Sequence, residues 1–417
     1  MSGSSGRSAG DRGSGLGKGA RAGRAQLERV LFLAGATMSS AVAVLGRRAE
    51  ESARRGLIDW RAAERMAIDR VRNAAGSLSL ADLHRADPVY ASAMAGIVPA
   101  LEEVLGVSLP GVVERAAVVD RATWVRENVA GFAALIGRVE SKLIERQMPP
   151  GMGLVRSGMA IVNRQITTRQ VGYLLGFIGQ RVLGQYDLAL LSTQAEPGRL
   201  MFVDENIRSV AAGLEVPLNP FRTWIALHET THAFEFEAHP WLRPYIAARL
   251  ERQLDSLSAI GSPGDQGAKR FRQALRSAGS RQSWMEAFMS AAQKREFREI
   301  QAVMSLLEGF GEYVMDELGR DLVPDVELIS ARFHARRTQR SGFEKAMMRL
   351  TGMDLKMEQY RKGERFVAAI ARARGADALR ELWRGPETMP QPEEINHPSR
   401  WLGRVMPAAG GEGGEGR

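Results

Sequence analysis

The sequence predicts a mainly helical protein with a small β-sheet. Apolar residues recur at three- and four-residue spacing over 57–75, 90–106, 121–147 and 155–190, which is the pattern of amphipathic helices. Strand-like stretches are few, and the clearest is 199–204. Hydrophobic residues make up 44% of the 417-residue chain and charged residues 25%, the profile of an ordinary globular protein. These observations favour an α-rich fold around a conventional hydrophobic core.

The composition limits the chemistry that is available. The chain has no cysteine, which excludes disulfides and thiolate metal sites, so a transition metal must be held by His, Asp or Glu. Only six histidines are present, so two of them four residues apart carry particular weight. The net charge is +9, and the first 25 residues hold five basic side chains against one acidic one. No basic stripe alternates with aromatic residues, so nucleic acid is not an expected partner.

The chain divides into five predicted segments. Residues 1–25 form a basic tail rich in Gly, Ser and Arg, and 405–417 a second polar tail; both are predicted to be disordered. Residues 26–56 form an apolar helix and linker. Residues 57–195 form a helical N-terminal part, and 196–404 a metal-binding part. The last two are expected to form one compact unit, because no long linker separates them.

The uncharged run over 30–46 leaves three interpretations open. A helix packed on the body or on a partner is favoured. Ala41-Val42-Ala43 resembles a cleavage site after an apolar stretch, as in a signal sequence. The run is also at the short end for a membrane anchor, and no other run could span a bilayer. We therefore expect a cytoplasmic protein, with membrane association or export as the alternatives. The oligomeric state is not indicated.

The main chemical motif is His228-Glu229-Thr230-Thr231-His232 on a predicted helix. Asn219 is a suitable N-cap and Pro220 fits the first helical position, while Pro240 requires the helix to end before it. The motif therefore lies well inside the helix and follows the predicted strand 199–204.

Positions i and i+4 of a helix lie on one face, so His228 and His232 can direct two imidazoles at one zinc ion. Glu229 is adjacent and can act as the general base toward a zinc-bound water, as in the H-E-x-x-H signature. The alternative is two partly buried histidines on an amphipathic helix. The position in mid-helix after a strand favours metal binding.

A second predicted helix, 300–319, supplies the third candidate ligand, Glu308. Glu308 follows a strongly apolar stretch, where an unpaired carboxylate is costly to bury and a metal would neutralise it. Gly309 and Gly311 are poor helix residues, which suggests that another backbone approaches closely here, with the His helix as the expected neighbour. The other histidines are expected to be structural or at the surface: His84, His239, His334 and His397.

Glu312 lies one turn after Glu308 on the same face. We expect Glu312 to accept the N–H of a metal-bound imidazole and so fix its tautomer. The alternative is a solvated acidic face that continues through Asp316.

Together with this motif, several other blocks make the chain resemble the actinobacterial zincin-like metallopeptidase family that is associated with deazaflavin-coenzyme biosynthesis. The blocks lie at 58–60 (IDW), 119–124 (VDRATW), 182–187 (VLGQYD), 227–243, 304–309 (MSLLEG), 356–366 (KMEQYRKGERF) and 398–402 (PSRWL). The resemblance covers about 57–404 and implies a zincin-like fold. It also implies one zinc ion held by His228, His232 and Glu308, with Glu229 as general base.

The chain departs from the family pattern in its N-terminal extension and at Phe310, where many members have His. The deazaflavin label is an association, so deazaflavin is not expected as a ligand. The leading hypothesis is a zinc-dependent metallopeptidase that acts on a peptide or protein, with strand 199–204 pairing with the substrate along the cleft. The alternative is an inactive zincin-fold scaffold or binding protein with structural zinc. Three residues are candidates for stabilising the oxyanion: Tyr313, Tyr360 and Arg361.

Overall fold

The computed structural model describes residues 56, 58–146, 153–186, 198–258, 290–338 and 353–407. The predicted tail 1–25, the apolar run 30–46 and the final residues 408–417 lie outside these ranges. None of the helices in the described ranges is both long enough and apolar enough to cross a membrane.

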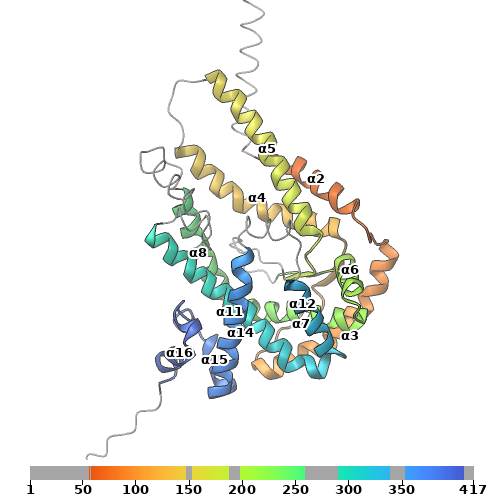
Figure 1. Ribbon diagram of the computed structural model, residues 1–417, viewed down its shortest axis with the longest axis vertical. Coiled ribbons are helices and arrows are strands. Elements are labelled where there is room, and N and C mark those ends of the chain that lie inside the picture. The colour runs from red at the N-terminus through yellow and green to blue at the C-terminus, as the bar shows by residue number, and fades with distance from the viewer. Residues whose placement is uncertain are drawn as a thin grey trace, which may run out of the picture. The chain divides into compact units, whose positions relative to one another are not determined.

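Helices dominate the described part of the chain, as the sequence predicted, and one small sheet accompanies them (Figure 1). The helices are α2 (Trp60–Arg72), α3 (Leu80–Leu105), α4 (Arg121–Arg146), α5 (Gly153–Gly179), α6 (Asp204–Leu214), α7 (Leu218–Glu237), α8 (Leu242–Ser258), α11 (Ala291–Leu322), α12 (Val326–Thr338), α14 (Met353–Arg374), α15 (Ala376–Leu382), η1 (Glu394–Asn396) and α16 (Pro398–Val405). The predicted fold class is confirmed.

The sheet has three strands in the order β1-β3-β2: β1 (Ala116–Val119), β3 (Leu200–Val203) and β2 (Gly184–Tyr186). The central strand β3 pairs parallel with β1 and antiparallel with β2. All four residues of β3 are buried, which agrees with its continuous apolar sequence. Because β3 has a neighbour on both sides, the prediction that strand 199–204 pairs with a substrate is wrong.

Alternate residues of β3 face two different hydrophobic clusters, as the two-residue period of a strand requires. Leu200 and Phe202 belong to the larger cluster, which is formed mainly by α3, α7, α11 and the C-terminal helices. Met201 and Val203 belong to a smaller cluster with residues of α2 and α4. The strand therefore joins the two cores.

Contacts along the chain separate two units. The larger contains residues 60–148 and 169–417, and therefore the whole sheet and α7. The smaller contains 1–59 and 149–168; in its described part, the Asp59 N–H donates to Thr168 Oγ1 at 2.9 Å, and Arg164 lies 3.5 Å from the Asp59 carboxylate.

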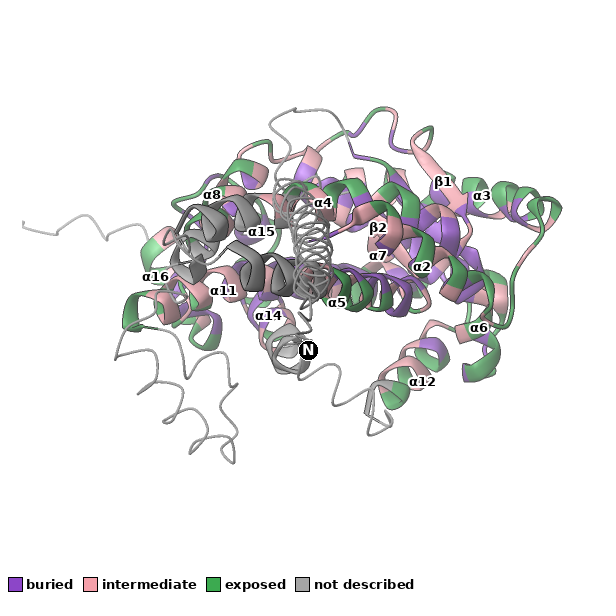
Figure 2. Cartoon of the chain, turned by 90° about the horizontal axis from the view of Figure 1, so that it is seen from above, coloured by how far each residue is buried: buried purple, intermediate pink, exposed green. Residues whose placement is uncertain are grey.

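Within the larger unit, α7 packs against α3, α11 and the strands β2 and β3. Twelve of its 20 residues are buried, and Figure 2 shows buried residues, in purple, around α7 and the sheet. A helix that is covered on so many sides is a rigid support for a site.

The start of α7 is anchored by a buried ion pair. Arg222 donates two hydrogen bonds to Asp204, from Nε to Oδ1 at 2.8 Å and from Nη2 to Oδ2 at 2.7 Å. The Tyr90 hydroxyl of α3 donates to the same carboxylate at 3.0 Å. Burial acts to raise the pKa of Asp204, but these hydrogen bonds and the Arg222 charge outweigh it and hold the pKa below its usual value.

Candidate metal centre

Helix α7 begins two residues earlier than the sequence predicted. Pro217 occupies the N-cap and Leu218 the first helical position, so Asn219 lies inside the first turn and accepts a hydrogen bond from Arg222 at 3.0 Å. Pro220 remains tolerable because the first-turn N–H groups have no helical partner. The helix ends at Glu237, before Pro240, as expected.

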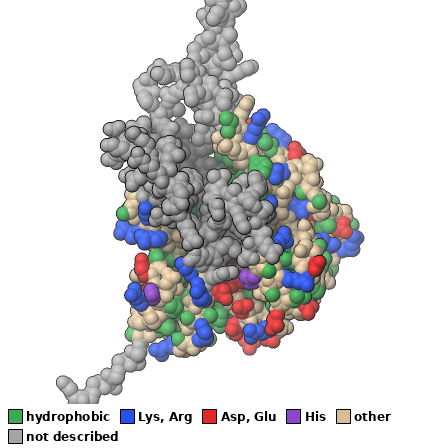
Figure 3. Space-filling model, in the orientation of Figure 1, with side chains coloured by type: hydrophobic (Ala, Val, Ile, Leu, Met, Phe, Trp, Pro, Cys, Tyr) green, Lys and Arg blue, Asp and Glu red, His purple; other side chains and the backbone are tan. Residues whose placement is uncertain are grey.

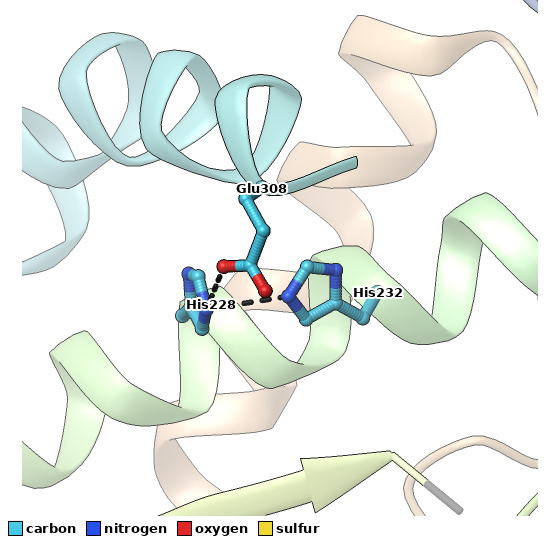
Figure 4. A group of neighbouring side chains, drawn as sticks. All are labelled: His228, His232 and Glu308. Carbon is cyan, nitrogen blue, oxygen red and sulfur yellow. Dashed lines mark hydrogen bonds and ion pairs between the residues drawn. The ribbon is translucent and has the colours of Figure 1, made fainter. Parts of the chain in front are cut away.

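His228 and His232 project from one face of α7, and Glu308 reaches toward them from α11 (Figure 4). The two Nε2 atoms lie 3.2 Å apart, and Glu308 Oε2 lies 3.9 Å from His228 Nε2. Among the residues that the structure describes, these three form the group of potential metal ligands, with all ligand atoms within 4.8 Å of one another.

The donor set fits zinc. Two nitrogens bound to one tetrahedral zinc at about 2.0–2.1 Å would lie roughly 3.3 Å apart, close to the separation observed here. The side chains of His228 and Glu308 are each 21% exposed, and that of His232 is 15% exposed. A set of three protein ligands that is partly open to solvent is typical of a catalytic zinc site, whereas structural sites are closed by four.

Glu229 lies beside this group, against strand β2. A Cβ atom on Gly184 would approach within 2.5 Å of Glu229 Cγ and 2.9 Å of its Oε1, so the strand backbone contacts the carboxylate directly. Burial raises the pKa of Glu229 to about 7, and the charge of Glu308 adds to this. The charge of His232 and a backbone hydrogen bond from Tyr186 act in the opposite direction. A carboxyl group with this pKa can exchange protons near neutral pH.

The glycines of α11 were predicted to allow a close backbone approach, and the structure gives them two different neighbours. Gly311 faces the site, because a Cβ there would lie 3.4 Å from His228 Nδ1 and Cε1. Gly309 faces α14 instead, where an added Cβ would overlap the backbone of Gly363 and Glu364. The expectation that the His helix is the close neighbour therefore holds for Gly311 and is wrong for Gly309.

Beyond Glu308, α11 continues into an acidic stretch. Glu312 Oε2 lies 3.8 Å from His334 Nε2, and burial together with the Glu312 charge raises the pKa of Asp316 and of Glu364. Figure 3 shows acidic side chains gathered on one part of the drawn face, with Lys and Arg distributed elsewhere. Glu312 thus lies in an acidic cluster with His334, and its expected hydrogen bond to a metal-bound imidazole stays a prediction.

One hydrogen bond to a site imidazole involves a residue that was not among the sequence candidates. Glu235 is buried on α7, and its Oε2 lies 2.8 Å from His232 Nδ1. A signal was present, since Glu235 follows His232 by three residues within the apolar run Phe234-Glu235-Phe236. The argument applied to Glu308, that a carboxylate in an apolar stretch needs a compensating partner, also applies here.

The remaining sequence candidates have structural surroundings or lie outside the described side chains. His239 donates from Nδ1 to the Glu235 carbonyl at 2.9 Å and stacks on Trp383 at 5.2 Å, which is a packing role. Phe310 is 1% exposed and packs edge-on against the same indole. Tyr313 packs partly against the larger core. The side chains of Tyr360 and Arg361 are not among those described.

Two comparisons with known proteins found similar proteins. Residues 58–402 match the model of the zincin-like metallopeptidase family. The structure is similar to the crystal structure of a proposed hydrolase with a novel fold from Chloroflexus aurantiacus. The two proteins share 34% sequence identity and a TM-score of 0.62, over 83% of this chain and 98% of that chain. A search of curated proteins found no match.

Proposed function

The chain belongs to the zincin-like metallopeptidase family, and from this premise we propose that it is a zinc-dependent hydrolase, most simply a metallopeptidase. The observation that carries the proposal is the convergence of His228, His232 and Glu308 beside a carboxyl group, Glu229, whose pKa is raised to about 7. The three residues would hold one zinc ion. Bound there, zinc would polarise a scissile carbonyl and lower the pKa of a bound water toward neutrality.

Glu229 performs the proton transfers in this proposal. It accepts a proton as the water oxygen forms a bond to the carbonyl carbon of the substrate. It then delivers that proton to the leaving nitrogen as the carbon–nitrogen bond breaks, so the carboxylate is regenerated. The contact with Gly184 holds the Glu229 side chain against β2 and restricts its position.

Strand β2 supports a peptide as the substrate. Among the strands of the described residues, β2 pairs with β3 alone and lies at an edge of the sheet. An extended peptide can add to such an edge through main-chain hydrogen bonds. Because Gly184 of β2 contacts Glu229, a peptide on this edge would pass close to the general base.

The test compares wild type with Glu229→Gln on a peptide library, together with metal analysis. The variant should retain about one zinc per chain and lose cleavage by roughly 10²–10⁴-fold, because it removes proton transfer and none of the three ligands. Glu103→Gln, at an exposed position of α3, serves as the matched control and should cleave normally. Undiminished cleavage by Glu229→Gln would contradict the assignment of the base.

A second candidate function is a binding protein that retains zinc without turnover. The observation in its favour is Phe310, which fills a buried position against Trp383 and offers no titratable group next to Glu308. The same library separates the two functions, because a zinc-loaded wild type that cleaves no peptide supports the binding protein.

A further inference from the structure

Glu235 is a buried carboxylate directly behind the proposed zinc site. It is 1% exposed, and its Oε2 lies 2.8 Å from His232 Nδ1. Its other oxygen, Oε1, is buried without a hydrogen-bond partner among the described residues. An ionised carboxylate in such surroundings is costly unless a positive charge compensates it. The compensating charge must act through the His232 ring, which contacts the carboxylate directly.

The hydrogen bond determines which nitrogen of His232 is available. A carboxylate at Nδ1 keeps a proton on that nitrogen, so Nε2 is the nitrogen that can offer its electron pair to a cation. Nε2 is the atom that lies 3.2 Å from His228 Nε2 and faces the centre of the ligand group. A negative charge behind the ring also makes Nε2 a stronger donor to a cation.

Different side chains lie next to the Nδ1 atoms of the two histidines. His228 Nδ1 lies 3.2 Å from the thioether sulfur of Met315, which is a weak neutral acceptor. His232 has a full carboxylate at the same position. The carboxylates of Glu235 and Glu308 thus both lie near the His232 ring, and a divalent cation is the simplest group that balances them.

We propose that Glu235 is a positioning residue that fixes the His232 tautomer and strengthens His232 as a ligand to zinc. This rests on the proposed function, because it assumes that zinc binds between the histidines. A zinc ion on Nε2 would act through the His232 ring to compensate the carboxylate that the chain buries at Glu235.

The experiment measures the zinc affinity of wild type, Glu235→Gln and Glu235→Ala by competition with a chelator. Removal of such a carboxylate weakens metal binding by about 10–100-fold, so we expect this loss in Glu235→Ala. Glu235→Gln has the same shape and its amide oxygen can accept the Nδ1–H, so it should recover part of the affinity. The visible spectrum of the cobalt-substituted protein reports the ligand field and should shift in both variants.

Glu237→Gln is the matched control. Glu237 is a carboxylate two residues further along α7, but its partners are Tyr186 and Arg115 rather than an imidazole. Its replacement should lower the melting temperature without changing zinc affinity or the cobalt spectrum. If the Glu235 variants behave in the same way as this control, Glu235 is only structural and the inference fails while the proposed function stands. If wild type itself binds no zinc, both fail.

Discussion

At the scale of single residues, the geometry of Glu229 depends on a glycine that is distant in the sequence. Gly184 lies 45 positions before Glu229, yet any side chain there would occupy the space of the Glu229 carboxylate. The strand thus presents bare backbone to the general base. Glycine is needed at position 184 because a side chain would collide with Glu229, and not because the strand requires a special backbone conformation.

Gly184→Ala is therefore expected to impair catalysis and to retain zinc. The added Cβ lies 2.5 Å from Glu229 Cγ, so the carboxylate must move, and a displacement of about 1 Å at a reacting group can cost roughly 100-fold in rate. Cleavage rate and zinc content measure the two effects separately. Gly403→Ala on α16, where a Cβ meets no atom within 4 Å, is the control. A wild-type rate in Gly184→Ala would show that this contact does not position Glu229.

At the scale of elements, the close packing of α11 on α14 holds Glu308 in place. Gly309 and Gly363 face each other, and a Cβ on either would overlap backbone of the opposite helix. Small residues at a crossing point allow two helices to approach more closely than larger side chains permit. Because Glu308 precedes Gly309 directly, the crossing also sets how far the third ligand reaches toward α7.

Gly309→Ala should separate these two helices. Overpacking of a dense core costs about 1–3 kcal/mol, which a denaturant titration would measure as a lower free energy of unfolding. Zinc affinity should fall as well, because Glu308 moves with the backbone. Gly213→Ala on α6, with its nearest side-chain atom 3.7 Å away, should be neutral or slightly stabilising. If Gly309→Ala and Gly213→Ala changed the free energy of unfolding and the zinc affinity equally, the α11–α14 crossing would not be what positions Glu308.

At the scale of the whole molecule, the site depends on how α3, α6 and α7 are joined. Tyr90, Asp204 and Arg222 come from these three helices and meet at one buried carboxylate. The Asp204 side chain is fully buried and that of Arg222 is 5% exposed. A substitution in this cluster would therefore shift α7 and with it the His motif, although the cluster holds no proposed ligand.

Asp204→Ala should destabilise the protein by about 3–5 kcal/mol, because it leaves the Arg222 charge buried without its carboxylate. Chemical denaturation would measure this loss. Asp377→Ala is the control: its ion pair with Arg380 is mostly exposed, and such pairs contribute only about 0–1 kcal/mol. If Asp204→Ala lowered the free energy of unfolding as little as the control does, Arg222 would have found another partner.

The site also links stability to pH. Burial raises the pKa of Glu229 and Glu235 to about 7. Burial lowers the pKa of His232, but the charge and hydrogen bond of Glu235 outweigh this and raise it to about 10. All three groups bind protons more tightly in the folded than in the unfolded state. They therefore stabilise the metal-free protein at low pH, and this stabilisation is lost as the pH rises through about 7 and about 10.

Zinc should reverse this dependence, because its binding displaces a proton and becomes stronger as the pH rises. We expect the difference in melting temperature between zinc-loaded and metal-free protein to widen from about pH 5 to about pH 9. Thermal melts with zinc and with a chelator at each pH would measure it. A difference that is constant across this range would contradict the proposed ligand set.

The sequence by itself determined the features that lie within one helix. The spacing of His228 and His232 and the adjacent Glu229 follow from helical geometry, and Glu308 was identified because a carboxylate in an apolar helix needs a partner. Only the tertiary structure decided that β3 is central and β2 an edge, that Gly309 faces α14, and that Gly184 contacts Glu229. The reason is physical: the i to i+4 relation is set by the local backbone, whereas these contacts join segments whose meeting depends on how all the helices pack.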